Sequence, residues 1–192
     1  MRLTNDIKNT IINNALEKSG YNKEIDEYYA ELSNLAVEIH EESFGGHKEM
    51  HRKLKIIEKA NEAFKSIDSR AAYIRVHYNH SVSCEVGGQI RYLDLPFKEA
   101  VVTCTLKIPG DHPIAYKLHA LDNLFEDLTK KRGDVINIVN PILNSVTTAK
   151  KLVTIWPEAE ELLPKECQLP AKTNLPAIQI ESANTLIGLP SN

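Results

Sequence analysis

The sequence predicts an α+β fold with an N-terminal helical hairpin, a small antiparallel β-sheet of three to four strands, C-terminal helices and an extended arm. Three observations support this prediction. Apolar residues recur every three or four positions in the first and last thirds of the chain, which is the spacing of one helical face. In the middle third they alternate with polar residues, as they do in half-buried strands. Prolines and paired glycines separate these stretches.

Length and composition narrow the class of protein. The chain has 192 residues, a net charge of −3 and three cysteines that form no Cys-x-x-Cys pair. We expect one α+β domain over residues 1–164, followed by an arm over 165–192 that packs on the domain or on a second subunit. The odd cysteine number is typical of the reducing cytoplasm, and no stretch approaches the roughly 18 apolar residues of a membrane span. These features predict a cytoplasmic protein that does not contact the membrane.

Two helices are expected near the N-terminus. The first begins after the capping residue Thr4 and ends at Ser19-Gly20. The second, over about 22–42, has one apolar face and one acidic face. The acidic face carries Glu24, Glu27, Glu31, Glu38, Glu41 and Glu42. A solvated surface is the simpler interpretation of these carboxylates. The functional interpretation is an acidic surface for a basic partner, such as the nucleic-acid-binding groove of a host protein.

A third helix, over 47–67, reverses the charge. Its inward residues are expected to be Met50, Leu54, Ile57, Ala60 and Phe64, and its basic residues are Lys48, Arg52, Lys53, Lys55 and Lys59. A basic helix could contact phosphates. Neutralisation by the second helix, in an antiparallel pair, is the simpler interpretation.

The middle of the chain is expected to form the sheet, with a hairpin at Gly87-Gly88. Its apolar side faces helices, and Tyr78 and Tyr92 are expected on that side. Its polar side is expected to carry Arg75, His77, Glu85, Arg91, Thr103, Thr105 and Lys107. This polar side would face water or a partner.

The C-terminal helices are predicted from proline and glycine positions. One helix runs over about 113–131 and stops at Gly133. The central helix begins at Asn140-Pro141 and ends at Trp156, because Pro157 cannot continue it. A short helix follows until Pro164. Trp156 lies on the apolar stripe of the central helix and is expected to be a core residue.

Two segments resemble a known family. They are MRLTNDIKNTIINNAL at residues 1–16 and SVTTAKKLVTIWPEAEELLP at residues 145–164. Both look like small phage and prophage proteins of the nucleotide-modification-associated domain series, fifth member. The resemblance implies a shared fold, a phage or prophage origin and the cytoplasm of a bacterial host. Its motifs are core and capping residues, so it implies no catalytic residue.

The sequence lacks the common catalytic motifs, which favours a non-enzymatic protein. The sequence has no phosphate-binding loop and no Gly-x-Gly-x-x-Gly. His47 and His51 could converge on one ion, and His77 and His80 could add ligands, but no carboxylate or cysteine has the spacing that would complete a metal site. Cys84 and Cys104 lie in apolar alternation, where a buried inert thiol is usual. We therefore expect no catalytic residue, no metal and no cofactor.

These observations give one function hypothesis and one alternative. The first is a phage- or prophage-encoded accessory protein whose acidic helix face binds and inhibits a host nucleic-acid-processing or defence protein. The alternative is a role in phage nucleotide or DNA modification through nucleotide or nucleic-acid binding. The residues expected to bind in that case are Arg75, His77, Arg91, Lys130, Lys131 and Arg132. A homodimer with exchanged C-terminal arms is also open.

Overall fold

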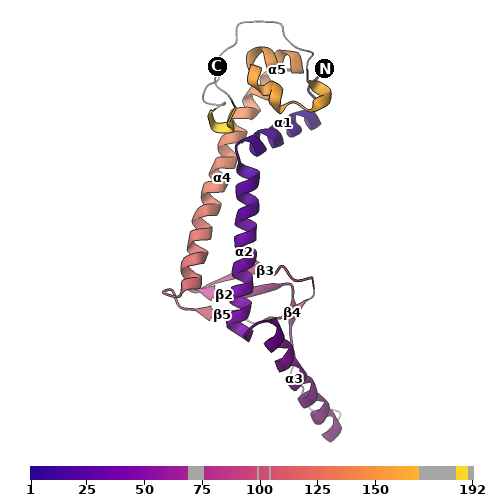
Figure 1. Cartoon of the computed structure of the whole chain (residues 1–192), viewed down its shortest axis with the longest axis vertical. Helices are drawn as coiled ribbons and strands as arrows, with labels where there is room; N and C mark the ends of the chain where they lie inside the picture. Colours follow the sequence, from indigo (N-terminus) through magenta and orange to yellow (C-terminus); the bar gives the residue numbers. More distant parts are fainter. Residues whose placement is uncertain (69–75, 99, 104, 169–184, 190–192) are drawn as a thin grey trace. The chain divides into compact units, whose positions relative to one another are not determined.

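The computed structural model describes residues 1–68, 76–98, 100–103, 105–168 and 185–189. Helices form both ends of the chain and strands form the middle (Figure 1), so the predicted α+β class is confirmed. The chain divides into two compact units. The first unit comprises residues 1–27 and 124–192, and the second unit comprises residues 28–123.

The first unit is helical. Its elements are α1 (Asn5–Lys18), the start of α2 (Tyr21–Phe44), the later part of α4 (Pro113–Ser145), α5 (Ala149–Ile155) and the 3-10 turns η1 (Pro157–Leu162) and η2 (Lys165–Cys167). Helix α1 begins as predicted, because the Thr4 hydroxyl accepts a hydrogen bond from the Ile7 amide at 3.3 Å.

Trp156 is fully buried in the core of this unit, which confirms the core interpretation. The other fully buried side chains of this core include Ile11, Leu143, Leu152, Leu162 and Ile187. Ile187 belongs to the C-terminal segment, whose described residues 185–189 pack in this unit. The course of the remaining arm lies outside the described residues and stays a prediction.

Helix α4 corrects two expectations. It continues through Gly133 and has Pro141 inside it, so the predicted stop at Gly133 and start at Asn140 are wrong. Val135, Val139 and Leu143 are fully buried along one side of α4, and this burial outweighs the local cost of glycine and proline. The chain breaks instead at residues 146–148, where the Thr148 hydroxyl caps α5.

The N-terminal segment stabilises this break. The Leu3 amide donates to the Thr147 carbonyl at 2.9 Å, and the Ala149 amide donates to the Met1 carbonyl at 3.0 Å. These bonds satisfy backbone groups that the end of α4 and the start of α5 leave without a partner in their own helices.

The second unit contains the rest of α2, α3 (His47–Ile67), the start of α4 and all the described strands. These are β1 (Tyr78–Asn79), β2 (Ser81–Val86), β3 (Gln89–Asp94), β4 (Val101–Val102) and β5 (Thr105–Ile108). The larger sheet has the order β3-β2-β5, and β1 pairs with β4 in a second, two-stranded sheet.

The larger sheet is mixed. Strands β2 and β3 form the expected antiparallel hairpin, and Gly87 and Gly88 supply the positive φ angles of its turn. Strand β5 instead runs parallel to β2. The sheet is therefore mixed rather than purely antiparallel, since β5 does not follow β3 through a tight turn and a longer connection permits parallel pairing.

Candidate functional site

Half of the carboxylates predicted to bind a partner are engaged within the chain. In the second unit, Lys117 donates to both carboxylate oxygens of Glu38 at 2.6 and 2.7 Å. In the first unit, Lys131 donates to Glu24 at 2.7 Å. Glu27 lies 3.5 Å from Lys23, one turn earlier in α2. The lysines of α4, rather than those of α3, therefore neutralise α2, and the predicted charge pairing of α2 with α3 is wrong.

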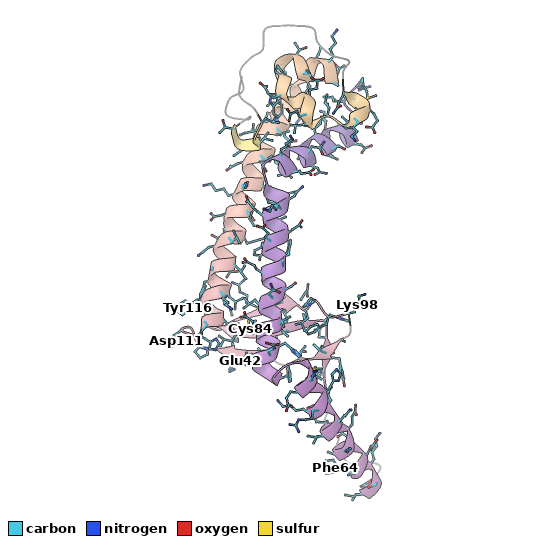
Figure 2. All side chains as sticks on the ribbon, viewed as in Figure 1. Glu42, Phe64, Cys84, Lys98, Asp111 and Tyr116 are labelled. Atoms are coloured by element: carbon cyan, nitrogen blue, oxygen red, sulfur yellow. The ribbon has the colours of Figure 1, made fainter. Side chains whose placement is uncertain are left out.

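The other three predicted carboxylates remain on the surface. Glu31, Glu41 and Glu42 are exposed, and none of them has an ion-pair partner among the residues that the structure describes. Figure 2 shows Glu42 near the end of α2. These three side chains are what is left of the predicted acidic binding surface.

Arg91 lies on the opposite side of the sheet from the one predicted. The hairpin register places Arg91 opposite Cys84, and directly opposite residues in a β-ladder point to the same side. Cys84 is fully buried, so this is the covered side of the sheet. Arg91 donates to Asp122 of α4 at 2.6 Å. Arg91 is therefore a structural ion-pair partner and does not belong to the open polar face.

Burial also sets the chemistry of the titratable groups near this ion pair. Burial raises the pKa of the Cys84 thiol, and Arg91 offsets this only in part. Burial likewise raises the pKa of the Tyr28 phenol, and the negative charge of Asp122 adds to the effect. A thiol with a raised pKa is protonated at neutral pH and is a poor nucleophile. This environment is that of a buried structural cysteine.

The open side of the sheet exposes aromatic and aliphatic side chains. Tyr92 is 73% exposed and Ile90 is 51% exposed, and on β1 Tyr78 is 56% exposed. The expectation that Tyr78 and Tyr92 face the core is therefore wrong. The turn contained the missed signal, because a two-residue loop places Val86 opposite Gln89 and thereby sets the side on which each β3 residue lies.

Neighbouring polar groups complete this open side. Tyr92 lies opposite Ser83, whose hydroxyl lies 2.9 Å from the Thr105 hydroxyl. Glu85 lies 3.9 Å from Lys107. The charges on this side are mixed in sign, so it does not form a basic surface.

Helix α3 carries the clearest basic surface of the second unit. We call Lys48, Arg52, Lys55 and Lys59 the basic stripe. Their spacing of four, three and four residues places them on one helical face. All four side chains are exposed. Arg52 makes a bidentate ion pair with Glu49 in the same helix, at 2.6 and 2.8 Å. Lys48, Lys55 and Lys59 have no ion-pair partner among the described residues.

The remaining predicted binding residues do not meet in one place. Lys130 and Arg132 are exposed on α4 in the first unit, whereas the neighbouring Lys131 is held by Glu24. His77 is exposed beside β1 in the second unit. Arg75 lies outside the described residues.

Two of the histidines considered as metal ligands lie in the first turns of α3. His51 is exposed, and the side chain of His47 lies outside the described part. No cluster of three or more histidine, cysteine, aspartate or glutamate side chains that could hold a metal occurs within the described ranges. Across those same ranges, no helix combines the length and the apolar character needed to cross a membrane.

Comparison with known proteins identifies the family. The profile described as nucleotide modification associated domain 5 matches residues 2–190, which is nearly the whole chain. No curated protein and no solved structure matches the chain. The match confirms the resemblance seen at residues 1–16 and 145–164 and extends it across the middle. The chain therefore belongs to the nucleotide modification associated domain 5 family.

Proposed function

We propose that this protein is a non-catalytic nucleic-acid-binding protein that takes part in nucleotide or DNA modification, and that the basic stripe of α3 contacts the phosphates. One observation carries this proposal. The carboxylates Glu24 and Glu38 of α2 pair with α4, so the lysines of α3 do not have the intramolecular acidic partner that the sequence suggested. Exposed lysines on one helical face are the side chains that bind a phosphate backbone.

The size of the basic stripe suits a nucleic-acid strand. Lys48 and Lys59 are 11 residues apart, which corresponds to about 16 Å along a helix with a rise of about 1.5 Å per residue. One strand of B-DNA places a phosphate about every 3.4 Å along its axis, so this length covers about five phosphates. Three of the four cations are free of ion pairs with described residues and could each release a counterion on binding.

A binding role, rather than catalysis, agrees with the chemistry of the second unit. The raised pKa and the burial of Cys84 disfavour a nucleophilic thiol. The carboxylate of Asp122 is occupied by Arg91. These groups support the packing of the sheet against α4, and the exposed charges of α3 supply the surface for a ligand.

The experiment compares two sets of substitutions in a DNA-binding titration. Fluorescence anisotropy of a labelled oligonucleotide is measured for the full chain at several salt concentrations. In K48A/K55A/K59A, loss of three phosphate contacts should weaken binding and lower the slope of log K against log salt by about 2–3. The matched control K130A/R132A/K150A removes three exposed cations from the first unit. An equal loss in both sets, or a loss in the control alone, would refute the assignment to α3.

A second candidate is the inhibition of a host protein by a phage- or prophage-encoded accessory protein. The observation that favours it is the exposure of Glu31, Glu41 and Glu42 without an ion-pair partner among the described residues. Such carboxylates could occupy the basic groove of a nucleic-acid-processing or defence protein.

Affinity purification from a bacterial host with nuclease treatment tests this candidate. E31K/E41K/E42K should lose a host protein that the unmodified chain retains after nuclease. The control E126K/D127K/E166K makes the same charge change at exposed sites of the first unit. Retention of the same host protein by both variants would exclude the acidic surface as its binding site.

A further inference from the structure

Helix α3 changes from buried to exposed along its length. Met50 and Leu54, in its first turns, are buried in the second unit. Phe64 is 45% exposed near the C-terminal end of the helix (Figure 2), so the expectation that it faces inward is wrong. The first turns are therefore the part of α3 that packing holds in place.

One carboxylate lies at the edge of the basic stripe in these first turns. Glu49 accepts two hydrogen bonds from Arg52, at 2.8 Å from Nε and at 2.6 Å from Nη2. Residues three apart are neighbours on a helix surface, so Glu49 adjoins the face that carries the four cations. Arg52 is thus the member of the basic stripe that has an anionic partner among the described residues.

The position of Glu49 is restricted by the glycine that follows α2. A Cβ at Gly45 would lie only 3.3 Å from Cγ of Glu49, so the stem of the glutamate uses space that exists because residue 45 has no side chain. The Glu49 side chain is 34% exposed, whereas the Arg52 side chain is 64% exposed. The carboxylate is therefore the more confined member of the pair, and the arginine is the one that can turn toward a ligand.

Glu49 keeps its negative charge at neutral pH. The hydrogen bond from Arg52 lowers the pKa of the carboxyl, burial offsets this in part, and the charges of Arg52 and Lys53 lower it further. The Lys53 ammonium itself donates to the Phe44 carbonyl at 2.9 Å, at the end of α2. A guanidinium binds a carboxylate and a phosphate in the same way, through two oxygens of one anion.

We propose that Glu49 is a built-in competitor for phosphate, which occupies Arg52 in the free protein and is displaced by a phosphate of the bound strand. This inference rests on the proposed binding of nucleic acid by the basic stripe, and it adds Arg52 as a fourth phosphate contact. Lys48 and Lys55 lie four and three residues from Arg52, so a strand held by these lysines brings a phosphate to the guanidinium. Breaking the ion pair costs part of the gain, so Glu49 limits how tightly the stripe holds a strand.

Neutralisation of Glu49 tests the competition. Fluorescence anisotropy of a labelled oligonucleotide is measured for the full chain in about 0.1 M salt. E49Q removes the charge and keeps the shape of the side chain, so the dissociation constant should fall about two- to five-fold, which is the range of one exposed ion pair. The control D111N removes a carboxylate at another exposed position of the second unit and should change the constant less than about two-fold.

A double-mutant cycle isolates the exchange of carboxylate for phosphate. In the E49Q background, R52A removes an uncontested phosphate contact and should weaken binding about five- to ten-fold. In the unmodified background, R52A removes the same contact but also removes the ion pair that binding has to break. The loss there should be only about two-fold. Both side chains lie on the surface, so circular dichroism should show the same helix content for all variants.

The outcomes separate this inference from the proposed function. If K48A/K55A/K59A loses affinity while R52A has the same effect in both backgrounds, the competition is overturned and the role of the basic stripe stands. An E49Q variant that binds no more tightly than D111N would also overturn the competition alone. Unchanged binding by K48A/K55A/K59A would overturn both proposals.

Discussion

Replacement of Trp156 with alanine should strongly destabilise the first unit. The side chain is fully buried among Ile11, Leu143 and Leu152. A buried aromatic side chain removes roughly 150–250 Å² from water, which at about 25 cal/mol per Å² corresponds to about 4–6 kcal/mol. Large-to-small replacements of core aromatics cost about 3–5 kcal/mol in practice. We expect the free energy of unfolding of this unit to fall by that amount.

The assay is urea unfolding followed by far-ultraviolet circular dichroism, because the variant lacks the only tryptophan of the chain. Tyr92→Ala is the matched control. The sequence pattern suggested that both aromatic residues are core residues, but Tyr92 is largely exposed. Its replacement should change stability by no more than about 0.5 kcal/mol. A Trp156 variant as stable as the unmodified chain, or a Tyr92 variant that loses several kcal/mol, would refute the burial on which this reasoning depends.

Four further predictions concern single positions. Gly188→Ala should lower the free energy of unfolding by about 1–2 kcal/mol, because φ is +72° there and a Cβ would lie 3.1 Å from the Lys18 carbonyl oxygen. Thermal unfolding measures this loss of stability, and an unchanged midpoint would contradict the prediction. Gly133→Ala should instead stabilise by up to about 1 kcal/mol, since the glycine lies inside α4 with no atom close to the added methyl. Thr148→Ala should lower the free energy of unfolding by about 1 kcal/mol, because α5 loses its capping hydroxyl. Urea unfolding measures the change for Gly133→Ala and for Thr148→Ala. A change of the opposite sign in either variant would count against the assigned helix boundaries. Burial raises the pKa of the Cys84 thiol in the folded state above its value in the unfolded chain. The free energy of unfolding should therefore be unaffected by this thiol below about pH 8.5 and should decline as the pH rises above that value. Cys84→Ala should show a smaller decline, and an equal decline would exclude this thiol as a cause.

Local sequence signals predicted the features that depend on only a few residues. The capping hydroxyl of Thr4 and the block to helix continuation at Pro157 act within one turn, and both boundaries were found where expected. The same kind of signal failed at Gly133 and Pro141. At these two positions, the burial of one side of α4 stabilises the helix by more than glycine and proline destabilise it.

The faces of β3 could have been predicted more accurately. The two-residue turn at Gly87-Gly88 determines which residues lie opposite one another, and it places Tyr92 on the side of Ser83 rather than of Cys84. The apolar character of Tyr92 and Ile90 suggested the other side. Register is set by backbone hydrogen bonds, so it holds even where it leaves aromatic residues exposed.

The sequence by itself determined the α+β class, the burial of Trp156 and the family, because periodicity, caps and motifs are properties of adjacent residues. Only the tertiary structure decided which charges meet. Glu24 and Glu38 could have paired with the lysines of α3 or of α4, and the ion pairs with Lys131 and Lys117 settled the choice. Partners distant in the chain compete for the same carboxylate, and the packing of whole helices decides that competition. The lysines of α3 are left exposed as a result.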